Sequence, residues 1–205
     1  MRNLKDYVLT TKISSVDDHV QESFKLGKNK VSKTTEYQYL PNDRDELRVI
    51  LRKRLAKDKN ADLNDIDVSK IDDMSYLFAN LDPHNIDISE WDVSNVKYMN
   101  FMFHFCDKFE SDLSEWDVSN VEDMQSMFAN CKQFEGKGLE NWNVFKVEDM
   151  QSMFIGCRKF NSDLSKWNVS KVKDMSDMFF ECNKFEGKDL ENWDVSHVKE
   201  YELYV

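Results

Sequence analysis

The chain has 205 residues, 40% of them hydrophobic, with only two prolines and five glycines, which excludes fibrous and low-complexity classes. Its net charge of -11 is uneven: residues 1–60 carry 14 basic and 9 acidic side chains, and residues 61–205 carry 14 and 30. Charges of +5 and -16 predict two parts, an N-terminal helical segment and cap (1–60) and a second domain (61–205). The acidity of the second part disfavours binding to nucleic acid or an anionic membrane.

The first twelve residues, MRNLKDYVLTTK, lack the apolar core of a secretory signal, and no stretch is long enough to span a membrane. We therefore expect a cytoplasmic protein of a bacterial or phage-infected cell. Apolar residues at helical spacing predict helical faces in residues 4–8 and 16–24, ending near Gly27. A phosphate site at Gly27 is disfavoured, because no strand-loop-helix pattern surrounds this single glycine.

Residues 41–57 give the clearest helix, with Asn42 or Asp43 as N-cap, acidic residues in its first turn and basic residues in its last. Its apolar face should cover the first of the repeats that follow. That face consists of Leu47, Ile50, Leu51 and Leu55. Two hypotheses remain for the basic residues: a solvated face, which the acidic neighbouring sequence favours, or a nucleic-acid contact. These residues are Arg48, Arg52, Lys53, Arg54 and Lys57.

From about residue 66 the sequence repeats a unit of 25 or 26 residues. The five tryptophans are 25, 26, 25 and 26 residues apart, and the four cysteines keep the same spacing. They are Trp91, Trp116, Trp142, Trp167 and Trp193, with Cys106, Cys131, Cys157 and Cys182. A fixed period in this range is typical of a solenoid, in which each unit buries its apolar face against its neighbours.

Within one unit, apolar residues at steps of three and four predict a helix of about three turns over residues 121–131, with Ser119 and Glu122 as a capping box. Trp116 and Val118 alternate with polar residues, which predicts a short strand before that helix. Parallel strands are spaced at about 4.8 Å and helices at about 8–10 Å, so the strands should lie on a tighter inner face. The extra residue of the longer units lies in a glycine-containing return such as 135–138. At the chain end, Tyr201, Tyr204 and Val205 are expected to close the last unit.

The pattern WDVSNVxxMxxMFxxCxxF, taken from residues 91–109 and 116–134, closely resembles the BspA-like leucine-rich repeat family of bacterial proteins. The resemblance covers residues 66–205. It implies an α/β solenoid: a curved, right-handed stack of five to six repeats of short parallel strands and helices, with a helical N-terminal cap. The resemblance also implies binding of other macromolecules, and it assigns no catalytic residue to this chain. Known members are often surface proteins with export signals, which are not seen here, and the opening of the chain resembles that of some phage-encoded proteins.

We expect neither an enzyme nor a cofactor. The cysteines occupy one repeat position each and are interpreted as buried thiols rather than as disulfides or zinc ligands. The histidines are scattered, and no nucleophile is paired with a base in any motif. The methionines at helical core spacing are interpreted as core filler rather than a ligand groove. Calcium at the carboxylates of Asp92 and Asp117 is disfavoured, since no loop gathers six oxygen ligands.

The hypothesis for function is protein binding through polar side chains on the exposed side of the predicted strands, where a rigid concave sheet meets a partner. These residues are Glu90, Asp92, Glu115, Asp117, Asn141, Asn143, Lys166, Asn168, Asn192 and Asp194. Phe145 joins them, because it replaces a predicted capping serine and an exposed aromatic is a frequent interface anchor. The alternative is that Phe145 packs over the neighbouring return.

We expect a monomer with an unidentified protein partner. The alternative function is a structural component of an assembly, such as a virion or surface layer, attached through the basic N-terminal segment.

Overall fold

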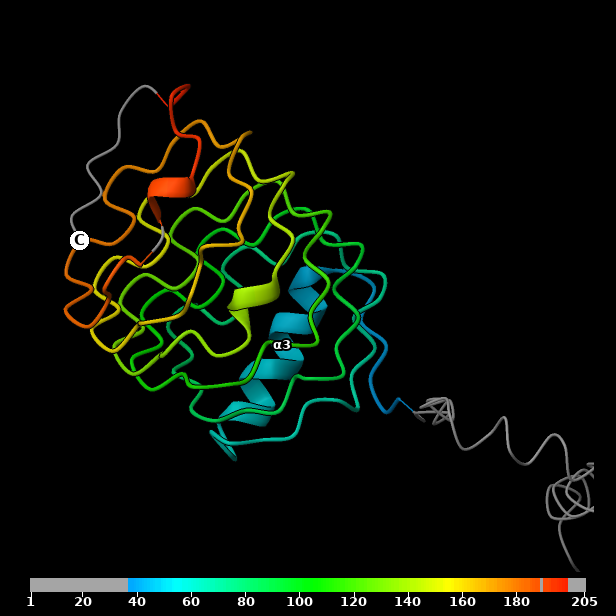
Figure 1. Cartoon of the computed structure of the whole chain (residues 1–205). Helices are drawn as coiled ribbons and strands as arrows, with labels where there is room; N and C mark the ends of the chain where they lie inside the picture. The colour runs from blue at the N-terminus through cyan, green and yellow to red at the C-terminus, as the bar shows by residue number, and fades with distance from the viewer. Residues whose placement is uncertain (1–36, 189, 199–205) are drawn as a thin grey trace, which may run out of the picture. The chain divides into compact units, whose positions relative to one another are not determined.

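The computed structural model describes residues 37–188 and 190–198, all within one compact unit (Figure 1). The helical faces predicted at 4–8 and 16–24, and the closing positions Tyr201, Tyr204 and Val205, lie outside these residues. Regular helices in the described part are α3 (Arg44–Leu55) and two single 3-10 turns, η1 (Leu139–Asn141) and η2 (Leu190–Asn192). The rest of the described chain winds through successive coils of one repeat each, built from turns (Figure 1).

The helix predicted in residues 41–57 is confirmed as α3. Asp43 is its N-cap, and the Asp43 carboxylate accepts a hydrogen bond from the Glu46 N–H at 2.9 Å. Acidic residues occupy the first turn and basic residues the last, as the helix dipole favours. Leu47, Leu51 and Leu55 are buried in the same core as the repeats, so the apolar face of α3 covers the first repeat as expected.

Adjacent repeats are joined by hydrogen bonds between their backbones. The N–H groups of Met124, Ser126, Phe128 and Asn130 donate to carbonyls of the following repeat at 2.7–3.0 Å. Their acceptors are Asp149, Gln151, Met153 and Ile155. The same four bonds recur from Met74, Met99 and Met150 onward, and one parallel bridge per repeat lies beside them. We call residues 72–82, 97–107, 122–132, 148–158 and 173–183 the ladder segments of repeats 1 to 5.

The predicted helices of the repeats were wrong. Residues 121–131 form consecutive turns closed by i→i+3 hydrogen bonds, such as Met127 N–H to Met124 and Cys131 N–H to Phe128, both within 3.1 Å. Ser126 and Asn130 have φ of 52° and 63°, in the left-handed region that no α-helix contains. The N–H groups that would close helical turns donate instead to the next repeat.

The predicted strand at Trp116 and Val118 was also wrong, because these residues stand at the ends of turns rather than in a paired strand. Parallel pairing between repeats does occur, mainly along the ladder segments, at Asp73, Tyr98, Asp123, Asp149 and Asp174, with a further bridge between Asp62 and Asp87. The described part is thus a stack of repeats with parallel contacts, of the solenoid type, that contains little regular strand or helix. The curvature and handedness of the stack stay predictions.

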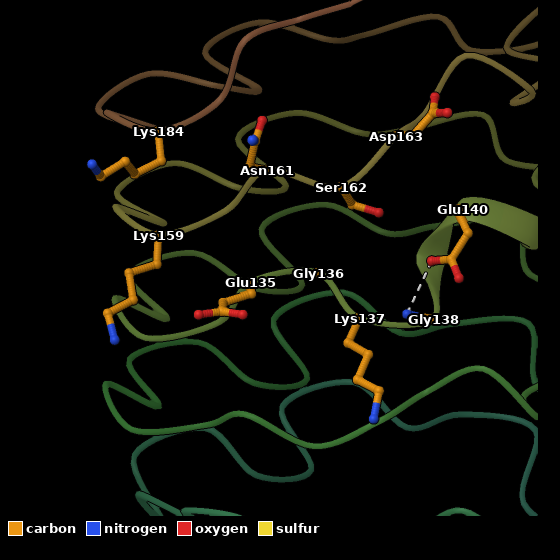
Figure 2. Close-up of a pocket in the computed structure, with 10 residues that line it drawn as sticks. All are labelled: Glu135, Gly136, Lys137, Gly138, Glu140, Lys159, Asn161, Ser162, Asp163 and Lys184. Atoms are coloured by element: carbon orange, nitrogen blue, oxygen red, sulfur yellow. Dashed lines mark hydrogen bonds between the residues drawn. The ribbon is translucent and has the colours of Figure 1, made fainter.

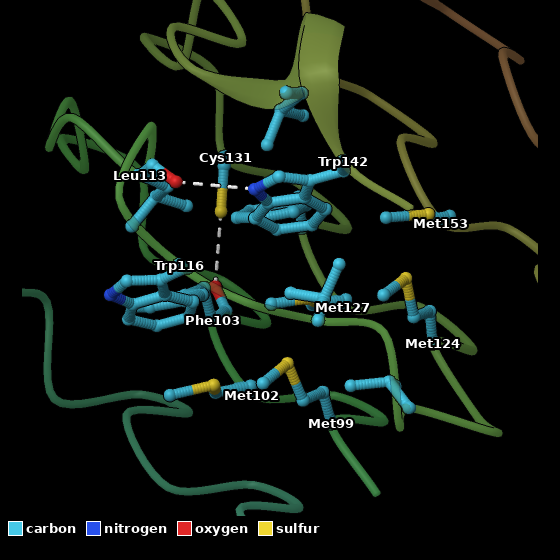
Figure 3. Close-up of a cluster of buried hydrophobic side chains, with 14 of the residues drawn as sticks. Met99, Met102, Phe103, Leu113, Trp116, Met124, Met127, Cys131, Trp142 and Met153 are labelled. Carbon is cyan, nitrogen blue, oxygen red and sulfur yellow. Dashed lines mark hydrogen bonds between the residues drawn. The ribbon is translucent and has the colours of Figure 1, made fainter. Parts of the chain in front are cut away.

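The core consists of columns, meaning side chains at the same position of successive repeats. Trp91, Trp116 and Trp142 stack with ring centroids 6.4 Å apart and planes within 3°. Each indole N–H donates to a carbonyl of the preceding repeat, as Trp142 does to Leu113 at 3.1 Å (Figure 3). The phenylalanines from Phe78 to Phe179 stack at 5.0–5.8 Å, and the methionine columns are buried beside them. The predicted burial of these columns is confirmed.

α3 also closes the hydrogen-bonding edge of repeat 1. The Arg48 guanidinium donates to the carbonyls of Tyr76, Leu77 (2.6 Å) and Ala79 (2.9 Å). In repeat 2 the carbonyls equivalent to those of Leu77 and Ala79 accept N–H groups of repeat 1, so Arg48 supplies the donors that a preceding repeat would provide. The prediction of solvated basic residues on α3 was therefore incomplete: Arg48 terminates the ladder, Arg54 pairs with Asp65 at 2.8 Å, and only Arg52, Lys53 and Lys57 are exposed.

Replacing Trp116 by Ala should lower the free energy of unfolding by about 3–5 kcal/mol, because it removes a large stacked ring and opens a cavity. Urea unfolding measures the loss. Val49→Ala is the control, since Val49 is exposed on α3 and its truncation should cost less than about 0.5 kcal/mol. A loss below about 1 kcal/mol for Trp116→Ala would contradict the stacked core.

Arg48→Met should destabilise the protein by about 1–3 kcal/mol, because methionine keeps part of the apolar stem and leaves the Leu77 and Ala79 carbonyls without their donor. The matched control is Arg52→Met, one helical turn further along α3 at an exposed position, where the change should stay within about 0.5 kcal/mol. Equal effects of the two variants in urea unfolding would show that Arg48 does not terminate the ladder.

Candidate interaction surface

All eleven residues predicted to meet a partner are exposed in the structure. They do not lie on the outer side of strands, because the segment that carries them forms turns. One of the two predicted columns has a local structural role. Its carboxylate and amide oxygens accept hydrogen bonds from the backbone N–H two residues on, at 3.0–3.3 Å. The pairs are Asp92 with Ser94, Asp117 with Ser119, Asn143 with Phe145, Asn168 with Ser170, and Asp194 with Ser196.

These Asx turns fix the corner that leads into each ladder segment. The hydrogen bonds from Ser119 are also the first cause of a lowered pKa at Asp117, so this carboxylate is ionised and occupied by its own backbone. In the described part of the chain, no three His, Cys, Asp or Glu side chains lie close enough to hold a metal ion.

Phe145 lies at the corner of repeat 4 and is 42% exposed. The Lys171 ammonium of the next repeat stands 4.3 Å from the centre of its ring, a cation–π contact. No helix follows Phe145, so the predicted loss of a helix cap was wrong. What Phe145 lacks is the hydroxyl bond that Ser94 and Ser196 donate to Asp92 and Asp194 at 2.6–2.7 Å.

Sequence reasoning missed a group of exposed and half-buried rings around the ladder segment of repeat 2. Tyr76 and Phe101 stack face to face, with centroids 4.7 Å apart and planes within 5°. His104 contacts both Phe101 (5.3 Å, edge-on) and Phe105 (4.4 Å). Tyr76 and Phe105 are 47% and 49% exposed, and Tyr98, at the bridge position of the same segment, is 42% exposed. We call these five side chains the aromatic patch.

The sequence does contain a signal for this patch, which is found when repeat 2 is aligned with the other repeats. Tyr98 stands where repeats 1, 3, 4 and 5 have aspartate. Phe105 stands where repeats 1, 3 and 4 have Asn80, Asn130 and Gly156. Partial burial lowers the pKa of His104, which favours the neutral imidazole near neutral pH.

An open groove of about 650 Å³ lies where the longer return 135–138 neighbours the shorter return 161–163 (Figure 2). Gly136 and Gly138 shape it, since both have positive φ and a Cβ on Gly138 would lie 2.3 Å from the Ser114 backbone nitrogen. Its rim mixes three lysines with three carboxylates: Lys137, Lys159 and Lys184 with Glu135, Glu140 and Asp163. This mixture favours no class of ligand, and we propose none.

The four cysteines are free thiols, and all are buried, which confirms the prediction. Each thiol donates to a carbonyl of the preceding repeat, as Cys131 does to Phe103 at 3.1 Å (Figure 3). Burial is the first cause of raised pKa values in all four, well above the ordinary value for Cys131 and Cys157 and to about 12 for Cys182. Such thiols are poor nucleophiles.

These features define a repeat protein with a buried aromatic stack and variable exposed side chains. The chain belongs to the family described as "Mycoplasma protein of unknown function, DUF285", whose profile matches residues 51–138 and 132–204. No curated protein and no solved structure matched the chain in the searches made against them. No helix in the described residues has the length and apolarity needed to cross a membrane.

The buried thiols predict a loss of stability at alkaline pH. Cys131 keeps its proton in the folded protein, whereas in the unfolded chain it ionises near pH 8.5. The unfolded state therefore binds fewer protons above that pH. The stabilisation is complete below about pH 8.5 and falls by about 1.4 kcal/mol per thiol and pH unit above it.

Urea unfolding of wild type and Cys131→Ala at pH 8 and pH 10 tests this. Between pH 8 and pH 10 the free energy of unfolding should fall by about 2 kcal/mol less in the variant than in wild type, since the tyrosines and lysines are the same in both proteins. Equal losses would contradict the assignment, and so would rapid labelling of Cys131 by a thiol reagent in the native state.

Proposed function

We propose that this chain is a non-enzymatic protein-binding module. The observation that carries the proposal is that buried positions are nearly constant from repeat to repeat, whereas exposed positions vary. The Trp, Met, Phe and Cys columns hardly change from one repeat to the next, while the exposed residues at equivalent positions differ in charge, size and polarity. A fixed scaffold that presents varied side chains suits recognition of one extended partner, because the presenting backbone is already ordered before binding.

The resemblance to BspA-like leucine-rich repeats supports the same function, and with it a curved, right-handed stack whose inner side receives the partner. We place the contact at the corner face formed by the eleven predicted residues, centred on Asp117, Asn143 and Phe145. All three are exposed. The Asx turns hold their backbone rigidly, so binding there orders few additional groups.

Phe145 is the proposed anchor of this face. Its ring is held from one side by Lys171 and keeps 42% of its surface in water. An aromatic ring that is positioned and exposed gains most from burial against a partner. Its return to serine would restore a residue found at this position in the other repeats, without disturbing the core.

Affinity capture from the native host, followed by quantitative mass spectrometry, tests the proposal. A specifically captured protein should fall at least tenfold in yield when wild type is replaced by Phe145→Ser. The free energy of unfolding of that variant should stay within about 1 kcal/mol of wild type. Ser94→Ala, at the same position two repeats away, is the control and should capture like wild type. Equal capture of every protein by Phe145→Ser and wild type would refute the anchor.

A further inference from the structure

We propose that the aromatic patch of Tyr76, Tyr98, Phe101, His104 and Phe105 is a second docking surface, which binds an acidic segment of a partner protein through one inserted apolar side chain. Its side chains come from the ladder segments of repeats 1 and 2, whereas the proposed anchor Phe145 lies at the corner of repeat 4. The inference shares with the proposed function only the premise that the chain binds proteins.

The backbone of repeat 2 holds the rings of the patch at a conformational cost. Phe101 and Phe105 both have φ of 57°, a region that bulky side chains rarely occupy, at about 1–2 kcal/mol each. At the same two positions repeat 3 has Ser126 and Asn130, and asparagine tolerates this conformation better. The two rings lie outside the core, and their ring contacts are with Tyr76 and His104 of the patch itself.

Tyr98 also differs from the residue at its position in the other repeats. In repeats 1, 3, 4 and 5 the aspartate at its position accepts a hydrogen bond from the backbone N–H two residues on, at 2.8–2.9 Å. Tyrosine removes that acceptor and presents a ring that is 42% exposed. Tyr98 and Phe105 each give up a local stabilisation and each add exposed aromatic surface, and Phe101 lies half-buried between them, which is the pattern expected of a functional site.

The charges around the patch favour an acidic partner. Ladder segments 1, 3, 4 and 5 carry -3, -1, -1 and -2, whereas that of repeat 2 carries no net charge. Lys97 and Tyr98 take two positions that hold carboxylates in repeats 1, 3 and 4. Uncharged surface on an otherwise acidic domain is where an acidic chain can approach with least repulsion.

Cations without partners border the patch. Arg52 of α3 shares a hollow of about 400 Å³ with Tyr76, and the exposed Lys97 precedes Tyr98. Neither makes an ion pair within the described residues. Three nearby carboxylates are already paired: Asp73 and Asp45 with Arg44 (3.0 and 3.5 Å), and Asp107 with Lys132 (2.7 Å). Asp72 and Glu122 flank Lys97 in the adjacent repeats and partly offset its charge. A partner carboxylate would therefore meet free cations at Arg52 and Lys97, with its apolar neighbour on the rings.

Selection from a phage-displayed library of random twelve-residue peptides tests the proposal on the full chain. The matched variant is Phe101→Ser with Phe105→Asn, which gives repeat 2 the residues of repeat 3 and reduces the left-handed strain at position 105. Peptides enriched on wild type should combine Asp or Glu with a large apolar residue. A synthetic peptide of the enriched sequence should bind the double variant at least tenfold more weakly, while Phe145→Ser binds it like wild type.

Charge reversal at the two cations tests their contribution to binding separately from that of the aromatic rings. Arg52→Glu with Lys97→Glu should weaken the same peptide about tenfold and reduce the salt dependence of its binding. Absence of enrichment, enrichment of basic peptides, or equal binding to the double variant would overturn the proposal. A wild-type dimer that the double variant loses in sedimentation would overturn it too, since a second copy would then be the occupant. If the double variant unfolds at a lower temperature than wild type, Tyr76→Ser replaces it in the same comparison.

Discussion

The structure depends on the hydrogen bonds that each repeat gives to the next. Met124, Ser126, Phe128 and Asn130 donate to residues 25 positions later, and the same bonds from repeats 1, 2 and 4 span 24 positions, so the pairing fixes how far apart equivalent residues must lie. An insertion within a ladder segment would displace every later donor. The one-residue difference between repeats is accommodated at the return, where Gly136 and Gly138 adopt positive φ and η1 follows. The same constraint leaves unpaired carbonyls at the first repeat, and the Arg48 guanidinium satisfies them.

The period, the core columns and α3 could be predicted from the sequence, because each rests on a strong local signal: rare residues at fixed spacing, or a helix with its cap. The conformation inside the repeat could not. Turns closed by i→i+3 bonds bury their first and last residues, as at Met124 and Met127 or Phe128 and Cys131. Helical packing produces the same steps of three and four. The distinguishing signal was the asparagine or glycine at Asn80, Asn130 and Gly156, which favours left-handed backbone and disfavours a helix interior.

The candidate sites, too, could be predicted from the sequence only in part. Exposure of the eleven predicted residues followed from their alternation with core positions, and it was correct. The role of the Asx column could not be predicted, because it depends on a turn where a strand was expected. The role of Arg48 could not be predicted either, because a basic residue on a helix gives no indication that carbonyls some 30 residues later need a donor. The aromatic patch required a comparison of repeats at positions outside the core.

Aromatic residues at positive φ in repeat 2 are tolerated because the neighbouring repeats determine the backbone there. The N–H groups of Phe101 and Phe105 donate to Gln125 and Ala129 of repeat 3, at 2.8 and 2.9 Å. The Asn100 and His104 carbonyls accept from repeat 1. With bonds on both sides, the conformation no longer depends on the side chain that occupies the position. A strain of about 1–2 kcal/mol per residue is then small beside the stacked core. Exposed positions can therefore change for recognition while the period and the core remain.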